Sequence, residues 1–228
     1  RREERVFLCL HDTVDFPAVF LGALHAGVVP VCVNTLLTAD DYAYMLAHSR
    51  AQTLVVSGAL WPTFGQVLAR GGHEVRHVVV SRPPEALTVQ ATSFAAWLEA
   101  APATPVPPAD TCGDDIAFWL YSSGSTGRPK GTVHTHANLY WTAELYGGPV
   151  LGLREDDVVF SAAKLFFAYG LGNALTFPLR VGATALLMAE RPTVNAVQQR
   201  LTRHDPTIFY GVPTLFASLL ADPGLRTG

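Results

Sequence analysis

Residues 116–131 read IAFWLYSSGSTGRPKG, in which six apolar or aromatic residues precede ten residues dominated by hydroxyls, glycines and one lysine. The first part is apolar on both faces, which is typical of a strand buried inside a sheet. In the second part, glycines let backbone N–H groups approach a phosphate because no Cβ is in the way. Four hydroxyls can donate to phosphate oxygens, and Lys130 adds a positive charge. The stretch predicts a buried strand followed by a phosphate-binding loop.

Two other interpretations of this loop fit its residues less well. Gly124 and Lys130 have the spacing of a P-loop, but Pro129 replaces the second glycine of that motif and Gly131 replaces its serine or threonine. Proline has no N–H to donate, and Gly131 has no hydroxyl to offer a magnesium ion. A flexible linker is also a poor fit, because linkers rarely follow so apolar a strand.

Upstream of the loop, short apolar runs alternate with amphipathic segments. Thr38, with Asp41 three residues later, forms a capping-box pattern that predicts the start of a helix. Alternation of this kind predicts an α/β fold, in which helices cover a parallel sheet and the connections are right-handed. We expect strands at residues 6–10, 28–33, 53–57 and 77–81, and helices at 15–26, 38–48 and 60–70.

A proline-rich connector divides the chain. Residues 101–110 contain four prolines and predict a loop or a semi-rigid spacer. We therefore expect a first α/β lobe over residues 1–110 and a second over 111–228, which carries the phosphate loop. The second lobe is predicted to have strands at 132–135, 158–162, 184–188 and 207–210, and helices at 137–146, 172–179, 193–204 and 213–220.

Composition excludes several classes of protein. Of 228 residues, 49% are hydrophobic and only 15% are charged, so the chain is not intrinsically disordered. A formal net charge of −3 and the lack of a basic run argue against binding to nucleic acid. Residues 16–39 carry no Asp, Glu, Lys or Arg, but Pro17, Gly22, Gly27 and Pro30 interrupt them, so we expect no membrane span.

The cysteines and histidines predict neither a disulfide framework nor a metal site. Cys9, Cys32 and Cys112 are far apart and odd in number, which favours reduced thiols in a cytoplasmic protein. His134 and His136 form the one close histidine pair, and no third ligand lies near them in the sequence.

Several segments resemble one enzyme family. Residues 122–131 resemble the phosphate-binding signature of the adenylate-forming enzymes, which include acyl-CoA synthetases, peptide-synthetase adenylation domains and luciferases. Residues 131–138, 161–170 and 210–214 are similar to later segments of that family. Residues 11–17 and 33–42 resemble its benzoate–CoA ligase branch in particular. The resemblance covers nearly the whole chain.

This resemblance implies a function. It implies an ATP-dependent, AMP-forming ligase that activates benzoate or a related aromatic carboxylate as an acyl-adenylate and transfers it to coenzyme A. ATP, Mg²⁺ and coenzyme A would be its cofactors, and a homodimer would be compatible with the family. It also implies that the chain is an incomplete N-terminal domain that lacks the small C-terminal domain, so that this piece alone would be inactive.

The resemblance also implies roles for particular residues. The catalytic residue would be Lys130, and the β- and γ-phosphates of ATP would be held by Ser122, Ser123, Gly124, Ser125, Thr126, Gly127 and Lys130. The aromatic acid would contact Phe167, Ala168, Tyr169 and Gly170. No metal ligand is assigned within the chain.

Residue types around the expected acid slot leave some alternatives open. Phe167 stands where many members of the family have histidine, and an aromatic residue there would suit a benzene ring. By residue type alone, Phe166 and Phe167 would be ordinary core aromatics. Lys164 could orient a carboxylate, but we favour a stem that lies on the surface with its ammonium in water. His136 is as consistent with capping a helix as with contacting the nucleotide.

Two other functions stay open at this point. A different adenylate-forming enzyme, such as another acyl-CoA synthetase or an amino-acid adenylation domain, would share the loop and differ in the slot at residues 166–169. A non-catalytic nucleotide-binding module would need only the loop.

Overall fold

The computed structural model describes residues 2–84, 87, 91–122 and 127–224. Contacts divide the chain into two compact units. The first consists of Arg1–His11 and Asp15–Ala137, and the second of Asp12–Val14 and Asn138–Gly228. The division therefore falls well after the proline-rich connector, because the strands on both sides of the phosphate loop pair with the strands of the first unit.

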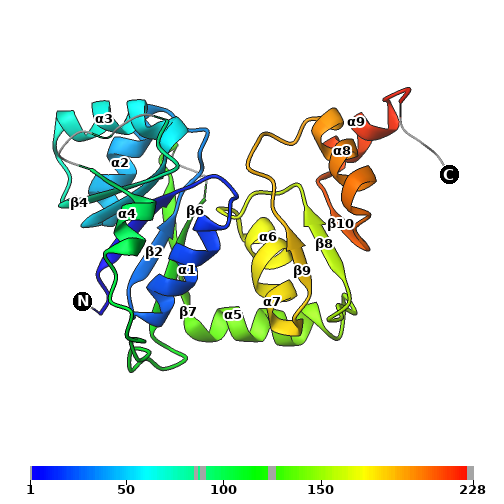
Figure 1. Cartoon of the computed structure of the whole chain (residues 1–228), viewed down its shortest axis with the longest axis horizontal. Coiled ribbons are helices and arrows are strands. Elements are labelled where there is room, and N and C mark those ends of the chain that lie inside the picture. Colours follow the sequence, from blue (N-terminus) through cyan, green and yellow to red (C-terminus); the bar gives the residue numbers. More distant parts are fainter. Residues whose placement is uncertain (1, 85–86, 88–90, 123–126, 225–228) are drawn as a thin grey trace. The chain divides into compact units, whose positions relative to one another are not determined.

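The described part of the first unit is built on a seven-stranded sheet in the order β5-β4-β3-β1-β2-β6-β7 (Figure 1). Every neighbouring pair is parallel except β6 and β7. A short connection such as 123–129 can join antiparallel neighbours, whereas parallel strands need a long crossover. The strands are β1 (Arg5–Cys9), β2 (Val29–Cys32), β3 (Thr53–Ser57), β4 (His77–Ser81), β5 (Thr92–Ser93), β6 (Ile116–Ser122) and β7 (Lys130–Thr135).

The helices of this unit are α1 (Asp15–His25), α2 (Ala39–Ser49), α3 (Trp61–Arg70) and α4 (Phe94–Glu99), with a 3₁₀ turn at Gly58–Leu60 before α3. The predicted capping box of α2 is confirmed. Thr38 Oγ1 accepts a hydrogen bond from the Asp41 N–H at 3.3 Å, and the Asp41 carboxylate accepts one from the Thr38 N–H at 3.1 Å. This pair satisfies two N–H groups that the helix itself leaves without partners.

Both faces of the first sheet are covered, which explains why β6 is apolar on both faces. On one face, Phe64 of α3 packs between Phe7 of β1 and Tyr42 of α2. On the other, Phe20 of α1 packs edge to face against Phe118 of β6. The alternation of side chains along a strand sends neighbouring residues to opposite faces. β6 itself is second from the edge and not central, and its first residue, Ile116, is exposed.

The second unit has a smaller sheet. Its described strands are parallel in the order β10-β8-β9, with bounds β8 (Val158–Ser161), β9 (Thr184–Leu186) and β10 (Ile208–Tyr210) (Figure 1). Phe160 packs on one face in a cluster with Met188 and Val197, and Val159 on the other face with Phe177. The helices are α5 (His136–Thr142), α6 (Ala168–Leu171), α7 (Phe177–Val181), α8 (Val194–His204) and α9 (Pro213–Leu220).

Two predicted helices differ in detail from the observed ones. The helix expected at 137–146 begins one residue earlier and ends in a π-helical turn over Ala143–Gly147. The helix expected at 172–179 is longer, because α6, a π-helical turn at Gly172–Thr176 and α7 follow one another without a break. None of the described helices is both long and apolar enough to span a bilayer, which takes about 20 residues.

Candidate functional site

The stems of the predicted phosphate loop lie side by side in the first unit. Ser122 ends β6, Lys130 begins β7, and the two residues are partners in the antiparallel ladder. Both are exposed, so their side chains are free to meet a ligand. Gly127 has a φ of +83°, a left-handed conformation that glycine adopts without strain. The other predicted loop residues, Ser123, Gly124, Ser125 and Thr126, lie outside the described residues.

Side chains of α2 contact both stems of this loop. The Tyr44 hydroxyl donates to the Pro129 carbonyl at 3.3 Å. A hydrogen bond of 2.8 Å joins His48 Nδ1 to the hydroxyl of Tyr121, on the strand that leads into the loop. Tyr44 and His48 are one helical turn apart and stack with ring centroids 5.5 Å apart. The helix therefore fixes the chain just before and just after the loop. No pattern in the sequence marks this contact, because it joins residues more than 70 positions apart.

The start of β7 also depends on a close approach of backbone to ring. A Cβ at Gly131 would lie 3.0 Å from the Trp119 ring and 3.6 Å from that of His48. Glycine thus lets β7 pass directly beside these two rings. The first residues of β7 are therefore held by packing against these rings as well as by the strand ladder.

The expected acid slot, residues 167–170, lies at the start of α6 in the second unit. Phe166 is buried at 3% exposure, whereas Phe167 and Tyr169 are 46% and 47% exposed. The interpretation as core aromatics therefore holds for Phe166 and is wrong for Phe167. Phe167 has an extended backbone and precedes the first helical residue, Ala168, and one side of its ring packs on Phe166 with centroids 4.5 Å apart.

The segment at residues 210–214 lies against this slot. The Tyr169 hydroxyl donates to the Gly211 carbonyl at 3.4 Å, and its ring meets the Tyr210 ring edge to face at 6.4 Å between centroids. Burial raises the pKa of Tyr210, whose hydroxyl has no hydrogen-bond partner among the described residues. Two segments that the sequence analysis singled out separately are thus neighbours in one unit.

Gly170 permits the tight turn that presents the slot. A Cβ there would lie 2.1 Å from the Lys164 carbonyl oxygen and 2.6 Å from that of Ala163. Both neighbours are backbone atoms, so no side-chain rotation could relieve the clash. The Phe167 N–H also donates to the Lys164 carbonyl at 3.0 Å. The backbone from Ala163 to Gly170 therefore folds back tightly on itself.

The expectation that the Lys164 ammonium lies in water is wrong. It donates to the carbonyls of Met188 and Glu190, the latter at 2.7 Å. The loop after β9 turns these carbonyls toward Lys164, which follows the end of β8. Partial burial lowers the pKa of the lysine. Because the ammonium already donates to two backbone carbonyls, its role in orienting a substrate carboxylate is correspondingly weaker.

Asp12 is a buried acid that the sequence analysis did not single out. It is 4% exposed, and both of its carboxylate oxygens accept from the Leu165 N–H at 3.2 Å. Burial raises its pKa to about 6, while the positive charge of Lys164 lowers it. The only sequence signal was its place in residues 11–17, which carry the family resemblance.

The two histidines of the pair have different surroundings. The His134 ring stacks on Phe118 with centroids 4.6 Å apart, and burial lowers its pKa. His136 is the first residue of α5, where its N–H donates to the Asp115 carbonyl at 3.1 Å. Within the described ranges, no three His, Cys, Asp or Glu side chains gather as metal ligands.

Comparison with known proteins identifies the family. The profile described as AMP-binding enzyme matches residues 1–227. The chain belongs to the AMP-binding enzyme family. It is 56% identical to the benzoate–CoA ligase of Thauera aromatica over 97% of the chain and 41% of that protein. It is 48% identical to the 4-hydroxybenzoate–CoA/benzoate–CoA ligase of Rhodopseudomonas palustris over 99% of the chain and 41% of that protein. The chain thus spans about 41% of the length of these curated relatives.

Solved structures of family members confirm the predicted α/β fold. A benzoate CoA ligase from Burkholderia xenovorans LB400 superposes with a TM-score of 0.90 at 58% identity, over 99% of this chain and 43% of that one. An anthranilate CoA ligase in complex with anthranoyl-AMP gives a TM-score of 0.94 at 36% identity with the same coverage. The resemblance to the adenylate-forming enzymes and to their benzoate–CoA ligase branch is confirmed by these findings.

Proposed function

We propose that this chain forms part of an ATP-dependent, AMP-forming ligase that joins benzoate, or a closely related aromatic carboxylate, to coenzyme A. One observation carries the proposal: identity is 56% and 48% to the two relatives whose names include benzoate–CoA ligase. It falls to 32% for two ligases named for hydroxybenzoates and for one named for anthranilate. This difference favours benzoate, with the 4-hydroxybenzoate that the second relative's name also includes as the substituted acid to compare.

The first half-reaction would rest on charge neutralisation. A carboxylate oxygen attacks the α-phosphorus of ATP, and the bond from that phosphorus to pyrophosphate breaks with its electron pair. No general base is needed, because the nucleophile is already an anion. The barrier lies in bringing two anions together, so positioning and positive charge do most of the catalysis. We assign this charge to Lys130, and its exposure at the start of β7, opposite Ser122, supports the assignment.

In the second half-reaction the thiol of coenzyme A attacks the acyl carbon of the acyl-adenylate. The carbon–oxygen bond to AMP breaks with its electron pair on the departing phosphate oxygen, and the thiol proton passes to solvent. Phe167 and Tyr169 would hold the ring of the acid during both halves, because exposed aromatic surfaces stack well on a benzene ring. Residues 165–170 carry no charge, which suits benzoate better than the ammonium group of an amino acid.

We propose that Mg²⁺ enters with ATP. The described residues offer the ion no cluster of acidic, histidine or cysteine ligands, and phosphate oxygens are ligands that Mg²⁺ prefers. Ser122 is the described loop residue whose hydroxyl could add an oxygen near the phosphates.

We also propose a cytoplasmic location. Cys9, Cys32 and Cys112 are free thiols, as is usual in a reducing compartment. A homodimer stays a prediction.

The function is tested with the full-length protein that carries this chain. AMP release would be measured with Mg-ATP, coenzyme A and each of benzoate, 4-hydroxybenzoate, acetate and a set of amino acids. We expect benzoate to give the highest kcat/KM. Activity with acetate or amino acids but not with benzoate would agree with the predicted phosphate loop and would refute the predicted aromatic slot. AMP release with none of these acids would favour a nucleotide-binding module without catalysis.

A conservative substitution tests the contact between α2 and the loop. Tyr44→Phe keeps the ring but removes the hydrogen bond to the Pro129 carbonyl. A neutral hydrogen bond contributes about 1 kcal/mol, so we expect the KM for ATP to rise about fivefold. The KM for benzoate should stay unchanged. Tyr140→Phe is the matched control, because it removes a tyrosine hydroxyl from a half-exposed residue of α5 that lies beside Arg180 in the second unit, and not in the unit that carries the loop stems. Equal effects of the two variants on ATP would contradict the role given to Tyr44.

A further inference from the structure

Lys164 lies at the junction of three segments of the second unit. It follows the end of β8, and its carbonyl accepts from the Phe167 N–H and lies under Gly170. Its ammonium donates to the Met188 and Glu190 carbonyls in the loop between β9 and α8. One residue thus joins the turn that presents the acid slot to a loop more than 20 positions away.

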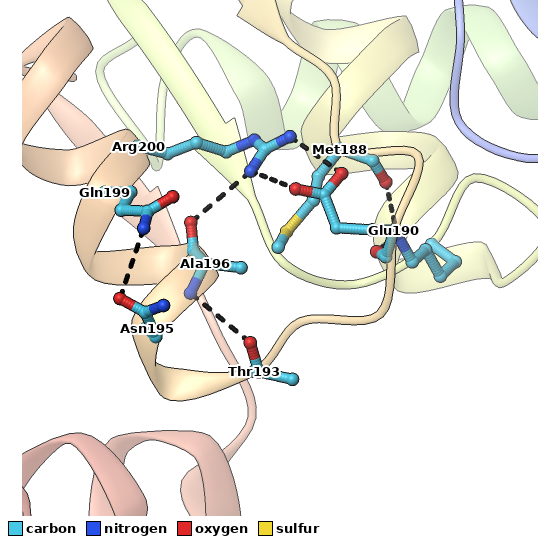
Figure 2. Close-up of polar contacts among 8 residues, drawn as sticks. Met188, Glu190, Thr193, Asn195, Ala196, Gln199 and Arg200 are labelled. Carbon is cyan, nitrogen blue, oxygen red and sulfur yellow. Dashed lines mark hydrogen bonds and ion pairs between the residues drawn. The ribbon is translucent and has the colours of Figure 1, made fainter.

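The neighbours of Lys164 are themselves fixed. The Glu190 carboxylate pairs with Arg200 of α8, with Nη2 to Oε2 at 2.8 Å, so its backbone carbonyl is the group that meets Lys164. Thr193 caps α8 by accepting from the Ala196 N–H at 3.3 Å (Figure 2). On the other side, the buried Asp12 holds the Leu165 N–H. The loop and the slot turn are each anchored on their own, and Lys164 connects them.

A charge at this position is costly in itself. Moving an ammonium out of water is unfavourable unless hydrogen bonds and an opposite charge replace its hydration. A methionine of similar length would fill the same space without that cost. Lys164 makes contacts that an apolar residue could not make, since carbonyl oxygens at a fixed place require a donor. Its ammonium therefore ties the loop to the slot turn through hydrogen bonds that methionine could not make.

We propose that Lys164 is a positioning residue for the aromatic acid: through the Met188 and Glu190 carbonyls it fixes the turn that presents Phe167 and Tyr169, and so sets the selectivity of the slot for the substituents on the ring. This inference rests on the proposed aryl-CoA ligase function. The proposed role differs from a direct contact between the Lys164 ammonium and the carboxylate of the acid. A direct contact would act on every acid equally, whereas a positioned slot discriminates between rings of different size.

The test compares benzoate with 4-methylbenzoate in the full-length protein. For Lys164→Met we expect the KM for benzoate to rise about 10-fold, since small displacements of a bound group have effects of this order or larger. The ratio of kcat/KM for benzoate to that for 4-methylbenzoate should fall toward one, and the KM for ATP should stay unchanged. Lys164→Arg, which can still donate to two carbonyls, should restore most of the ratio. Arg203→Met removes an exposed cation from α8 and should change neither the KM for benzoate nor the ratio.

Three results would overturn the proposal: equal losses on both acids with an unchanged ratio, an equal loss on ATP, or no rescue by arginine. If Lys164→Met does not fold, Lys164→Gln replaces it, because the shorter neutral amide cannot keep both hydrogen bonds to the Met188 and Glu190 carbonyls. That variant should lower the ratio in the same direction, and an unchanged ratio in a folded Lys164→Gln would refute the role of Lys164. Wild-type activity on benzoate tests the proposed function separately, because the proposal concerns only how the benzoate to 4-methylbenzoate ratio changes from wild type to variant.

Discussion

Replacing Lys130 with alanine is expected to slow acyl-adenylate formation by about 100-fold or more, the usual effect of removing one preorganised donor from a developing negative charge. Lys130 is exposed at the first position of β7 and is the ladder partner of Ser122, so its side chain leaves the sheet at the mouth of the loop. An ammonium there would neutralise the phosphates as pyrophosphate departs. Exchange of labelled pyrophosphate into ATP, with benzoate present, measures this half-reaction alone.

Two further variants make this result specific. Lys130→Arg keeps the charge with a different shape and should recover part of the rate. Arg128→Ala removes a second cation two positions away, whose guanidinium lies over the Tyr44 ring at 5.4 Å. Because that guanidinium lies over the Tyr44 ring, its removal should slow pyrophosphate exchange much less than removal of Lys130. If Lys130→Ala exchanged pyrophosphate at the wild-type rate, the catalytic role of Lys130 would have to be abandoned.

The local features of the chain could be predicted from the sequence, because local patterns cause them. The Thr38 capping box and the strands at 53–57 and 77–81 were found with the expected bounds. The apolar run before the phosphate loop was correctly assigned to a strand, since its two faces meet different helices. In each case the residues that determine the structure are close together in the sequence.

What could not be predicted depends on contacts between distant segments. Hydrophobic periodicity shows that β7 is a strand but does not show which way it runs beside β6. The partners of Lys164 are backbone carbonyls, which every residue has, so no side-chain pattern marks them. The contact of Tyr44 with Pro129 likewise joins groups that nothing in the sequence sets apart from their neighbours. Site residues that act through the backbone are therefore the ones most easily missed.

Gly170→Ala is expected to damage the acid slot more than any side-chain deletion within it. The new Cβ would lie 2.1 Å from one backbone oxygen and 2.6 Å from another, so the turn from Ala163 must open. Overpacking of this kind destabilises a protein by about 1–3 kcal/mol or more. Because Phe167 and Tyr169 move with the turn, kcat/KM for benzoate should fall about 100-fold, as expected when reacting groups are displaced by about 1 Å.

The control is another glycine of the same unit. Gly148 has a negative φ, and a Cβ added there would have no heavy atom within 4 Å, so Gly148→Ala should leave activity and thermal unfolding nearly unchanged. Two measurements distinguish a displaced slot from general unfolding in Gly170→Ala. They are the KM for ATP, and pyrophosphate exchange at a saturating concentration of the acid. A folded Gly170→Ala protein with wild-type KM for benzoate would mean that the turn at 163–170 does not form the acid slot. Since Phe167, Tyr169 and the positioning role of Lys164 all depend on that turn, this one substitution tests them together.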